Sequence, residues 1–156
     1  MFEEEMMLLA LKQAEIACKK QDVPVGAVIV KDGKIVAKAY NKKEKKQNAT
    51  YHAEVLAINK ACKKFKNFRL EGCTMFVTLE PCAMCCGAII ASRISKVVFG
   101  AFDENYGCAG SKYNLLQDKA FEHTVEVKGG VLQEDCQKLL KEFFKTIRKN
   151  KRYKNV

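Results

Sequence analysis

The 156-residue sequence predicts an α/β fold, a three-layer α/β/α sandwich built on a mixed five-stranded sheet. β-rich runs alternate with helical patterns over most of the chain, which is typical of a layered α/β domain. Two of the runs are joined by a tight hairpin signal, so they should pair antiparallel. Two others flank a helical pattern, and such a strand–helix–strand unit normally forms a right-handed parallel crossover.

The first part of the chain predicts one helix and one hairpin. Apolar residues from Met7 to Cys18 recur at i, i+3, i+4 and i+7, the spacing of an amphipathic helix. Two β-rich runs follow, Val25 to Val30 and Lys34 to Tyr40. Asp32 and Gly33 lie between them and both tolerate positive φ, as a two-residue hairpin requires.

The rest of the chain predicts the crossover and a closing helix. An apolar stripe from Leu132 to Ile147 indicates a long amphipathic helix at about 131–156, and Gly107 to Ser111 reads as a loop. The other predicted elements are a helix at 53–64, a strand at 74–78, a helix at 82–92, a strand at 96–99 and an edge strand at 125–127.

Length and composition predict one domain spanning residues 1–156, because no linker, repeat or low-complexity segment divides the chain. No apolar run approaches the roughly 20 residues needed to span a bilayer. Glu3, Glu4 and Glu5 stand where a signal peptide carries cations. We therefore expect a cytoplasmic protein without membrane association. Its eight cysteines should be thiols or metal ligands rather than a disulfide framework.

The net charge of +10 is concentrated near the C-terminus. Between Lys138 and Val156 there are eight Lys and Arg residues and one acidic residue. A second basic run, Lys42 to Lys46, precedes the motif described next. Either run could be a solvated face. Even so, a charge this high favours a polyanionic partner, most commonly nucleic acid.

One set of residues has the spacing of a metal site. His52 precedes one predicted helix, and Cys82 and Cys85 lie at the start of another, three residues apart and so on one helical face. Free N–H groups and the helix dipole favour thiolates at such a position. Two helix starts can therefore supply one nitrogen and two sulfurs to a single ion.

Three protein ligands leave the fourth tetrahedral position of Zn²⁺ for water, which indicates a catalytic rather than a structural site. Bound zinc lowers the pKa of that water toward about 7. Glu54, two residues after His52, could shuttle protons without binding metal. The combination of H-x-E with P-C-x-x-C is the known signature of zinc-dependent nucleobase deaminases. Redox or structural-zinc readings explain a lone C-x-x-C, but they would not need His52 and Glu54.

Cys86 is the alternative to Cys85 as the third ligand. The signature spacing selects Cys85, and the next helical position points about 100° away. His123 has no partner motif nearby, so a surface or packed histidine is the better interpretation.

Beyond these ligands the sequence resembles the bacterial tRNA-specific adenosine deaminases, nearly from end to end. The stretches that carry the resemblance are 23–28, Tyr40-Asn41, His52-Ala53-Glu54, 77–82, 93–101, Asp103, Gly107, 109–111, Phe143-Phe144 and Arg148. Ala49 and Tyr51 depart from the family pattern, in which proline and a small residue are usual. Both departures concern the loop before His52 and leave the zinc set intact.

The resemblance implies a cytidine-deaminase-like fold and a homodimer that converts adenosine to inosine at the wobble position of a tRNA anticodon stem-loop. It implies one Zn²⁺ per subunit held by His52, Cys82 and Cys85, with Glu54 as the proton shuttle. Zinc-bound hydroxide would attack C6 of an extruded adenine.

The resemblance also implies a set of substrate-binding residues. Asn41 and the backbone N–H of Ala53 would hold the purine, and Val25 would line its site. Asp103 would contact the RNA beside the flipped base, and Arg148 would belong to an RNA-contacting C-terminal segment.

Two other functions stay open at the level of sequence. A small-molecule deaminase of the guanine or cytidine type could use the same zinc core, although the basic C-terminus argues against it. A non-catalytic RNA-binding subunit could keep zinc for stability, although an intact Glu54 argues against that.

Overall fold

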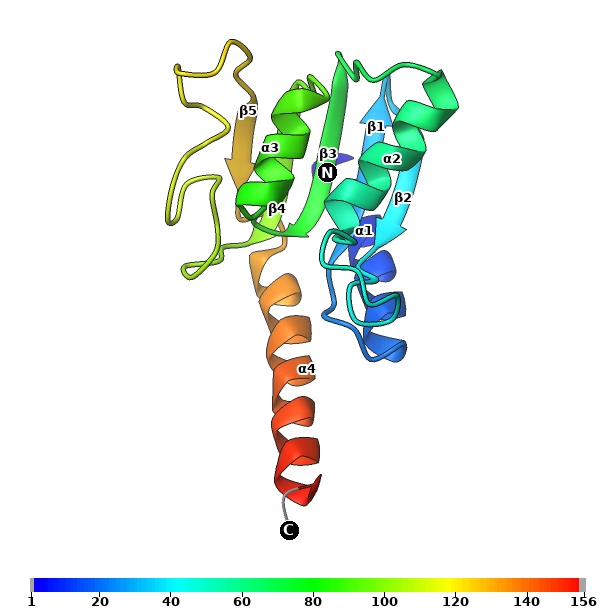
Figure 1. The fold of residues 1–156 in the computed structure, drawn as a ribbon, viewed down its shortest axis with the longest axis vertical. Helices are drawn as coiled ribbons and strands as arrows, with labels where there is room; N and C mark the ends of the chain where they lie inside the picture. Colours follow the sequence, from blue (N-terminus) through cyan, green and yellow to red (C-terminus); the bar gives the residue numbers. More distant parts are fainter. Residues whose placement is uncertain (1, 155–156) are drawn as a thin grey trace.

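A mixed five-stranded sheet with the strand order β2-β1-β3-β4-β5 lies at the centre of the computed structural model (Figure 1). The structure describes residues 2–154, and side chains as far as residue 150. β1 pairs antiparallel with β2 and with β3, whereas β3, β4 and β5 are parallel. The strands are β1 Gly26–Lys31, β2 Lys34–Tyr40, β3 Cys73–Leu79, β4 Lys96–Ala101 and β5 Glu126–Gly129. The predicted α/β fold with a mixed sheet is confirmed.

Helices cover both faces of this sheet. α2 (Ala53–Phe65) and α3 (Ala83–Ala91) lie on one face, and α1 (Phe2–Lys19) packs on the other together with the first turns of α4 (Gln133–Lys154) (Figure 1). Strand residues alternate between the two cores, as period-2 side-chain geometry requires. Met75 and Val77 face α2 and α3, while Phe76 between them faces α1 and α4.

The hairpin between β1 and β2 forms as predicted. Asp32 (φ 50°) and Gly33 (φ 73°) both adopt left-handed backbone, the requirement of a type I′ turn. β1 begins at Gly26, one residue after the predicted Val25. A Cβ on Gly26 would lie 2.0 Å from the carbonyl oxygen of Ala10, so the absent side chain lets α1 cross the strand closely.

The other boundaries shift for local backbone reasons. α3 begins at Ala83 because Cys82 has extended backbone (φ −78°, ψ 177°). Leu132 has φ 52°, so α4 starts at Gln133 rather than at 131. β5 starts after Val125, whose N–H donates to Leu116 O rather than to β4. The last two residues of the predicted closing helix lie outside the described part of the chain.

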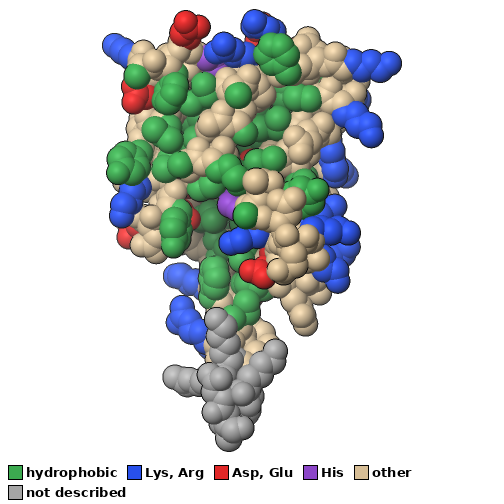
Figure 2. Space-filling view, viewed as in Figure 1, with side chains coloured by type: hydrophobic (Ala, Val, Ile, Leu, Met, Phe, Trp, Pro, Cys, Tyr) green, Lys and Arg blue, Asp and Glu red, His purple; other side chains and the backbone are tan. Residues whose placement is uncertain are grey.

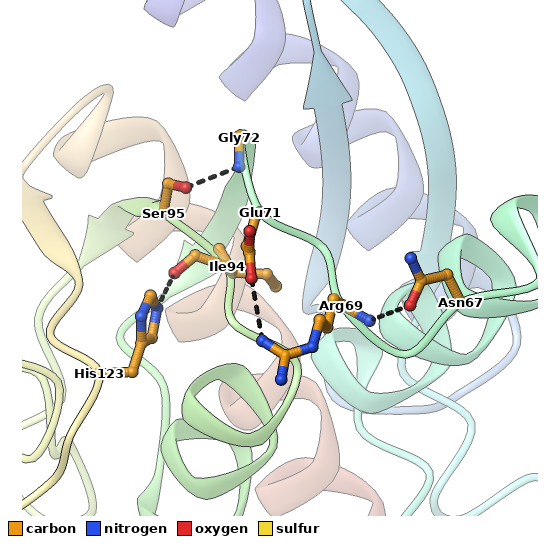
Figure 3. A network of polar contacts seen from close by, with 7 residues as sticks. All are labelled: Asn67, Arg69, Glu71, Gly72, Ile94, Ser95 and His123. Carbon is orange, nitrogen blue, oxygen red and sulfur yellow. Dashed lines mark hydrogen bonds and ion pairs between the residues drawn. The ribbon is translucent and has the colours of Figure 1, made fainter.

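Polar contacts connect the segments around the starts of β3 and β4 (Figure 3). A ring nitrogen of His123 lies 2.7 Å from Ile94 O, and the Gly72 N–H donates to Ser95 Oγ at 2.8 Å. The first contact ties the long connection before β5 to the start of β4. His123 is half-buried, and of the two interpretations, a surface or a packed histidine, the packed one fits this contact.

None of the eight cysteines forms a disulfide, so the structure holds no disulfide framework, in line with the expectation of thiols or metal ligands. Within residues 2–154, no helix is both long enough and apolar enough to cross a membrane.

Candidate metal centre and substrate cavity

Two helices begin with a residue of the metal motif instead of a capping residue. His52 and Cys82 are the N-caps of α2 and α3, each with extended backbone, and neither side chain makes a capping hydrogen bond. Ser, Thr, Asp or Asn normally fill this position, because their side-chain oxygens accept a hydrogen bond from the first turn. Here the two side chains are directed toward each other instead. Because Cys82 is the N-cap, it precedes α3, and the expectation that it is the first residue of that helix was wrong.

The three proposed ligands lie together. His52 Nδ1 is 3.7 Å from Cys82 Sγ and 3.6 Å from Cys85 Sγ, and all three donor atoms lie within 4.8 Å of one another. In a tetrahedral zinc site with Zn–S near 2.3 Å and Zn–N near 2.0 Å, nitrogen and sulfur are about 3.5 Å apart. The donor types and their spacing therefore fit a zinc ion. Cys86 is fully buried and its Sγ contacts Pro81 O, away from His52.

The two cysteines divide the protonation states between them. A hydrogen bond from the Cys85 thiol, opposed by burial and aided by His52, lowers the pKa of Cys82 to about 4. The hydrogen bond to Cys82 and burial raise the pKa of Cys85. The same Cys82 thiolate raises the pKa of His52. Metal ligation by both sulfurs must therefore release the proton of Cys85.

Glu54 is the second residue of α2 and is 4% exposed. Burial raises its pKa, and the negative charge of Cys82 adds to this effect, while His52 and local hydrogen bonds act in the opposite direction. A buried carboxyl group with a raised pKa, beside a cluster of metal ligands, is the kind of group that serves general acid–base catalysis.

A cavity of about 420 Å³ opens beside these groups. This volume lies within the roughly 300–1,000 Å³ typical of small-molecule sites. Its lining residues are Val23, Val25, Asn41, Lys43, His52, Ala53, Glu54, Leu79, Glu80, Cys82, Asp103 and Tyr106. The structure thus brings together Val25, Asn41, Ala53 and Asp103 from four separate segments. Arg148 does not line it and is exposed on α4.

The Asn41 side chain is held in one orientation by its neighbours. Its Nδ2 group donates to Asp22 Oδ1 and to Val23 O, both at 3.1 Å. Its Oδ1 accepts from the Lys43 N–H at 3.1 Å. Both amide N–H groups are therefore used, and Oδ1 keeps one further acceptor site.

Backbone N–H groups decide what Asp103 and Ala53 offer to the cavity. Asp103 Oδ1 accepts from the N–H groups of Asn105 and Tyr106, each at 3.1 Å, so this side chain also closes its own turn. Ala53 is the first residue of α2, and its N–H therefore has no partner inside the helix.

Sequence reasoning missed the roles of two buried carboxylates. Asp22 is 1% exposed and accepts from the N–H groups of Glu44 and Lys45, which fixes the basic 42–46 segment beside Asn41. Glu80 is 2% exposed and binds the 103–111 loop. Glu80 stands directly before the cysteine motif, but linear spacing gives no sign of which distant loop it contacts.

Positive charge surrounds the cavity on more than one side. Lys and Arg side chains gather along the side of the molecule that carries α2 and β2, and again on α4, whereas the surface over α3 is largely apolar (Figure 2). Lys43 lines the cavity itself. Ala49 and Tyr51, which depart from the family pattern, do not.

Comparison with known proteins agrees with this geometry. The sequence model of the MafB19-like deaminases matches residues 1–148. The tRNA-specific adenosine deaminase of Bacillus subtilis is 50% identical over 96% of this chain and 93% of its own length. That of Aquifex aeolicus is 45% identical over 96% and 99%. A solved structure from work on A-to-I editing by tRNA:A34 deaminases superposes with a TM-score of 0.84 at 34% identity, over 87% of this chain and 99% of that one.

The layered sheet and the His–Cys–Cys cluster beside a buried glutamate define a protein of the cytidine-deaminase-like class. Within this class, the relatives that are 50% and 45% identical over 96% of the chain are both tRNA-specific adenosine deaminases. The chain belongs to the family of tRNA-specific adenosine deaminases.

Proposed function

We propose that this protein hydrolytically deaminates adenosine to inosine at the wobble position of a tRNA anticodon. The observation that carries the proposal is the cavity, in which a metal-ligand cluster and a buried glutamate adjoin side chains suited to a purine. The kinship to tRNA-specific adenosine deaminases over nearly the whole chain supports the choice of substrate.

His52, Cys82 and Cys85 would hold one Zn²⁺ per subunit. When bound, zinc supplies Lewis-acid activation of a water molecule, whose pKa falls toward about 7. Support for zinc comes from the nitrogen and sulfur donors and their 3.6–3.7 Å separations.

Glu54 is proposed to move the protons. Its carboxylate takes one proton from the attacking water and delivers it to N1 of the purine. It then takes the second proton from the hydroxyl group added at C6 and passes it to the amino group, so that the bond from C6 to that nitrogen breaks and ammonia leaves. Burial, which raises the pKa of Glu54, suits a group that must both accept and donate a proton.

The purine is proposed to lie against Val25, with the Ala53 N–H and Asn41 Oδ1 as its hydrogen-bond partners and Asp103 at its edge. Such a base must first leave its stack. A single-stranded anticodon loop meets this requirement at lower cost than a duplex.

We propose that residues 1–156 form a single domain and that its basic C-terminal helix binds RNA. The basic end of α4, with Arg148, would contact phosphates. We also propose a homodimer acting in the cytoplasm. Sedimentation of the metal-loaded protein tests the dimer.

The function is tested by incubating the zinc-loaded protein with a synthetic anticodon stem-loop and measuring inosine by mass spectrometry of the digested RNA. Free adenosine, guanine and cytidine serve as parallel substrates. Inosine in the stem-loop alone is the expected result. Turnover of a free base or nucleoside without turnover of the stem-loop would replace the proposal with a small-molecule deaminase.

A further inference from the structure

Glu80 joins the end of β3 to the 103–111 loop, the segment from Asp103 to Ser111. Its Oε1 accepts from the Asp103 N–H at 3.1 Å and from the Ser111 hydroxyl. Its Oε2 accepts from the N–H groups of Ala109 at 3.0 Å and Ser111 at 2.9 Å. Two oxygens with four donors form a pattern that a carboxylate satisfies fully and a carboxamide does not.

The contact is tightly enclosed. Within the described side chains, residues 2–150, no Lys, Arg or His forms an ion pair with Glu80. A Cβ on Gly107 would lie 2.5 Å from Oε2, so the loop packs directly against the carboxylate. The donors of the loop are thus its main stabilising partners, and each would be costly to leave unsatisfied.

Backbone bonds on both sides of Glu80 reinforce the link. The Glu80 N–H donates to Ala101 O at 2.8 Å, and the Cys108 N–H donates to Pro81 O at 2.9 Å. The metal-ligand segment that starts at Cys82 is therefore anchored to the loop independently of the Glu80 side chain. The carboxylate is therefore not needed for that anchor, and the loop that it holds includes Asp103 and Tyr106, which line the cavity.

We propose that Glu80 is a positioning residue for substrate: its carboxylate holds the 103–111 loop so that Asp103 and Tyr106 form the wall against which the RNA binds. The inference rests on the proposed function. Asp103 has two constraints, because Glu80 fixes its N–H while its own Oδ1 accepts from residues 105 and 106. The loop therefore has a preformed shape before RNA arrives, which lowers the ordering cost of binding.

Glu80→Gln separates this role from general support. The Gln amide best keeps its oxygen toward Ala109 and Ser111, because the reverse orientation would set two backbone N–H groups against an NH₂ group. The NH₂ group then faces the Ser111 hydroxyl, which can rotate to accept, and the Asp103 N–H, which cannot. The substitution should release Asp103 selectively.

The first measurement is site-resolved amide hydrogen exchange by NMR on the zinc-loaded protein. In Glu80→Gln the Asp103 amide should exchange at least about tenfold faster, since a hydrogen bond to a charged acceptor is lost. The Ala109 and Ser111 amides should stay protected. Asp22→Asn is the matched control, a buried carboxylate beside Asn41. By the same reasoning its oxygen stays with the Glu44 and Lys45 N–H groups, so the variant should expose the Val23 amide to faster exchange and leave the Asp103 amide protected.

The second measurement is steady-state deamination of the stem-loop. Glu80→Gln should raise KM about tenfold and leave kcat within about twofold, the pattern of lost ground-state binding. Combined with Asp103→Ala, it should raise KM by less than the product of the two single effects, because both changes act on the same wall. Ser111→Ala, at an exposed position, should give a smaller rise in KM.

Three results would overturn the proposal: an Asp103 amide that stays protected in Glu80→Gln, multiplicative effects on KM in the double variant, or loss of zinc. Zinc loss would mean that Glu80 supports Cys82 rather than the loop. If the wild-type protein makes no inosine, the proposed function fails. The exchange measurement still reports whether Glu80 holds the loop.

Discussion

The metal corner, where α2 and α3 begin, and the far end of α4 are opposite environments. At the corner, Cys85 is fully buried and Glu54 nearly so, and Cys85 Sγ lies 3.6 Å from His52 Nδ1. α4 leaves the sheet after its first turns and projects beyond it, and its cations at 145, 148 and 149 are exposed (Figure 1). Low dielectric strengthens interactions at the corner, whereas water and salt screen those of the helix end.

The difference assigns different kinds of effect to the two regions. A substitution at the corner should change metal content or the rate of the chemical step. A substitution at the helix end should change affinity for RNA and its dependence on salt, without altering the chemistry. The four predictions below test this division.

The largest effect is expected for Cys85→Ala. Removing one of three ligands should abolish stoichiometric zinc binding and all measurable deamination, because two donors cannot complete the site. Cys86→Ala is the matched control: its sulfur contacts Pro81 O and should be dispensable for the metal. Zinc content by mass spectrometry decides between them, and zinc lost from Cys86→Ala but kept by Cys85→Ala would reverse the ligand assignment.

Glu54→Ala should keep zinc and the fold but lower kcat by about 10² to 10⁴, the usual contribution of positioned acid–base catalysis. Single-turnover inosine formation measures the rate of the chemical step directly. Near-normal turnover by a zinc-loaded variant would exclude Glu54 as the proton carrier.

The corner was also the more predictable of the two regions, because its logic is local in sequence. Each ligand stands at the start of a helix that hydrophobic spacing already predicts, and Asp32-Gly33 fixed the hairpin for a comparable reason. Three predicted starts were wrong for local reasons: Cys82 has extended backbone, Leu132 has positive φ, and the Val125 N–H donates to Leu116 O instead of β4. Hydrophobic periodicity does not register such changes.

The walls of the cavity were less predictable. Asp22 and Glu80 hold loops that lie more than 20 residues away along the chain. Such pairings depend on the sheet order and strand directions, which bring the start of β1 together with the ends of β2, β3 and β4. A buried acid next to a proline gives no sign in the sequence of which donors it meets. The resemblance placed Asn41 and Asp103 at the site, but the carboxylates that orient them emerged only from the structure.

In the unmodified protein, salt concentration should affect RNA binding by the helix end much more than the chemical step at the metal corner. Raising salt from 50 to 200 mM should weaken stem-loop binding by roughly tens of fold if about four phosphates are neutralised. The value of kcat at saturating RNA should change by less than about twofold, since the buried corner is little screened. Deamination at several salt concentrations gives both quantities, and a kcat that falls in parallel with affinity would contradict the division.

The smallest effect sharpens the comparison at the helix end itself. Replacing Lys145, Arg148 and Lys149 by Gln removes three exposed cations while keeping good helix formers. Each phosphate contact on single-stranded RNA contributes about 0.7 to the slope of log affinity against log salt, so the slope should become shallower by at most about 2. Zinc content and kcat should not change.

The control for this change removes the same charge at the opposite end of the molecule. Lys63, Lys64 and Lys66 are exposed at the C-terminal end of α2, remote from the projecting part of α4 (Figure 1). If the RNA contacts α4, replacing these three lysines by Gln should leave the salt slope nearly unchanged, because they contact no phosphate. If the net charge of +10 attracts the RNA without a defined contact, both triple variants should change the slope equally. Equal slopes for the two variants would mean that net charge alone attracts the RNA. A slope unchanged by the α4 variant would restrict the RNA-binding surface to the cavity and its walls.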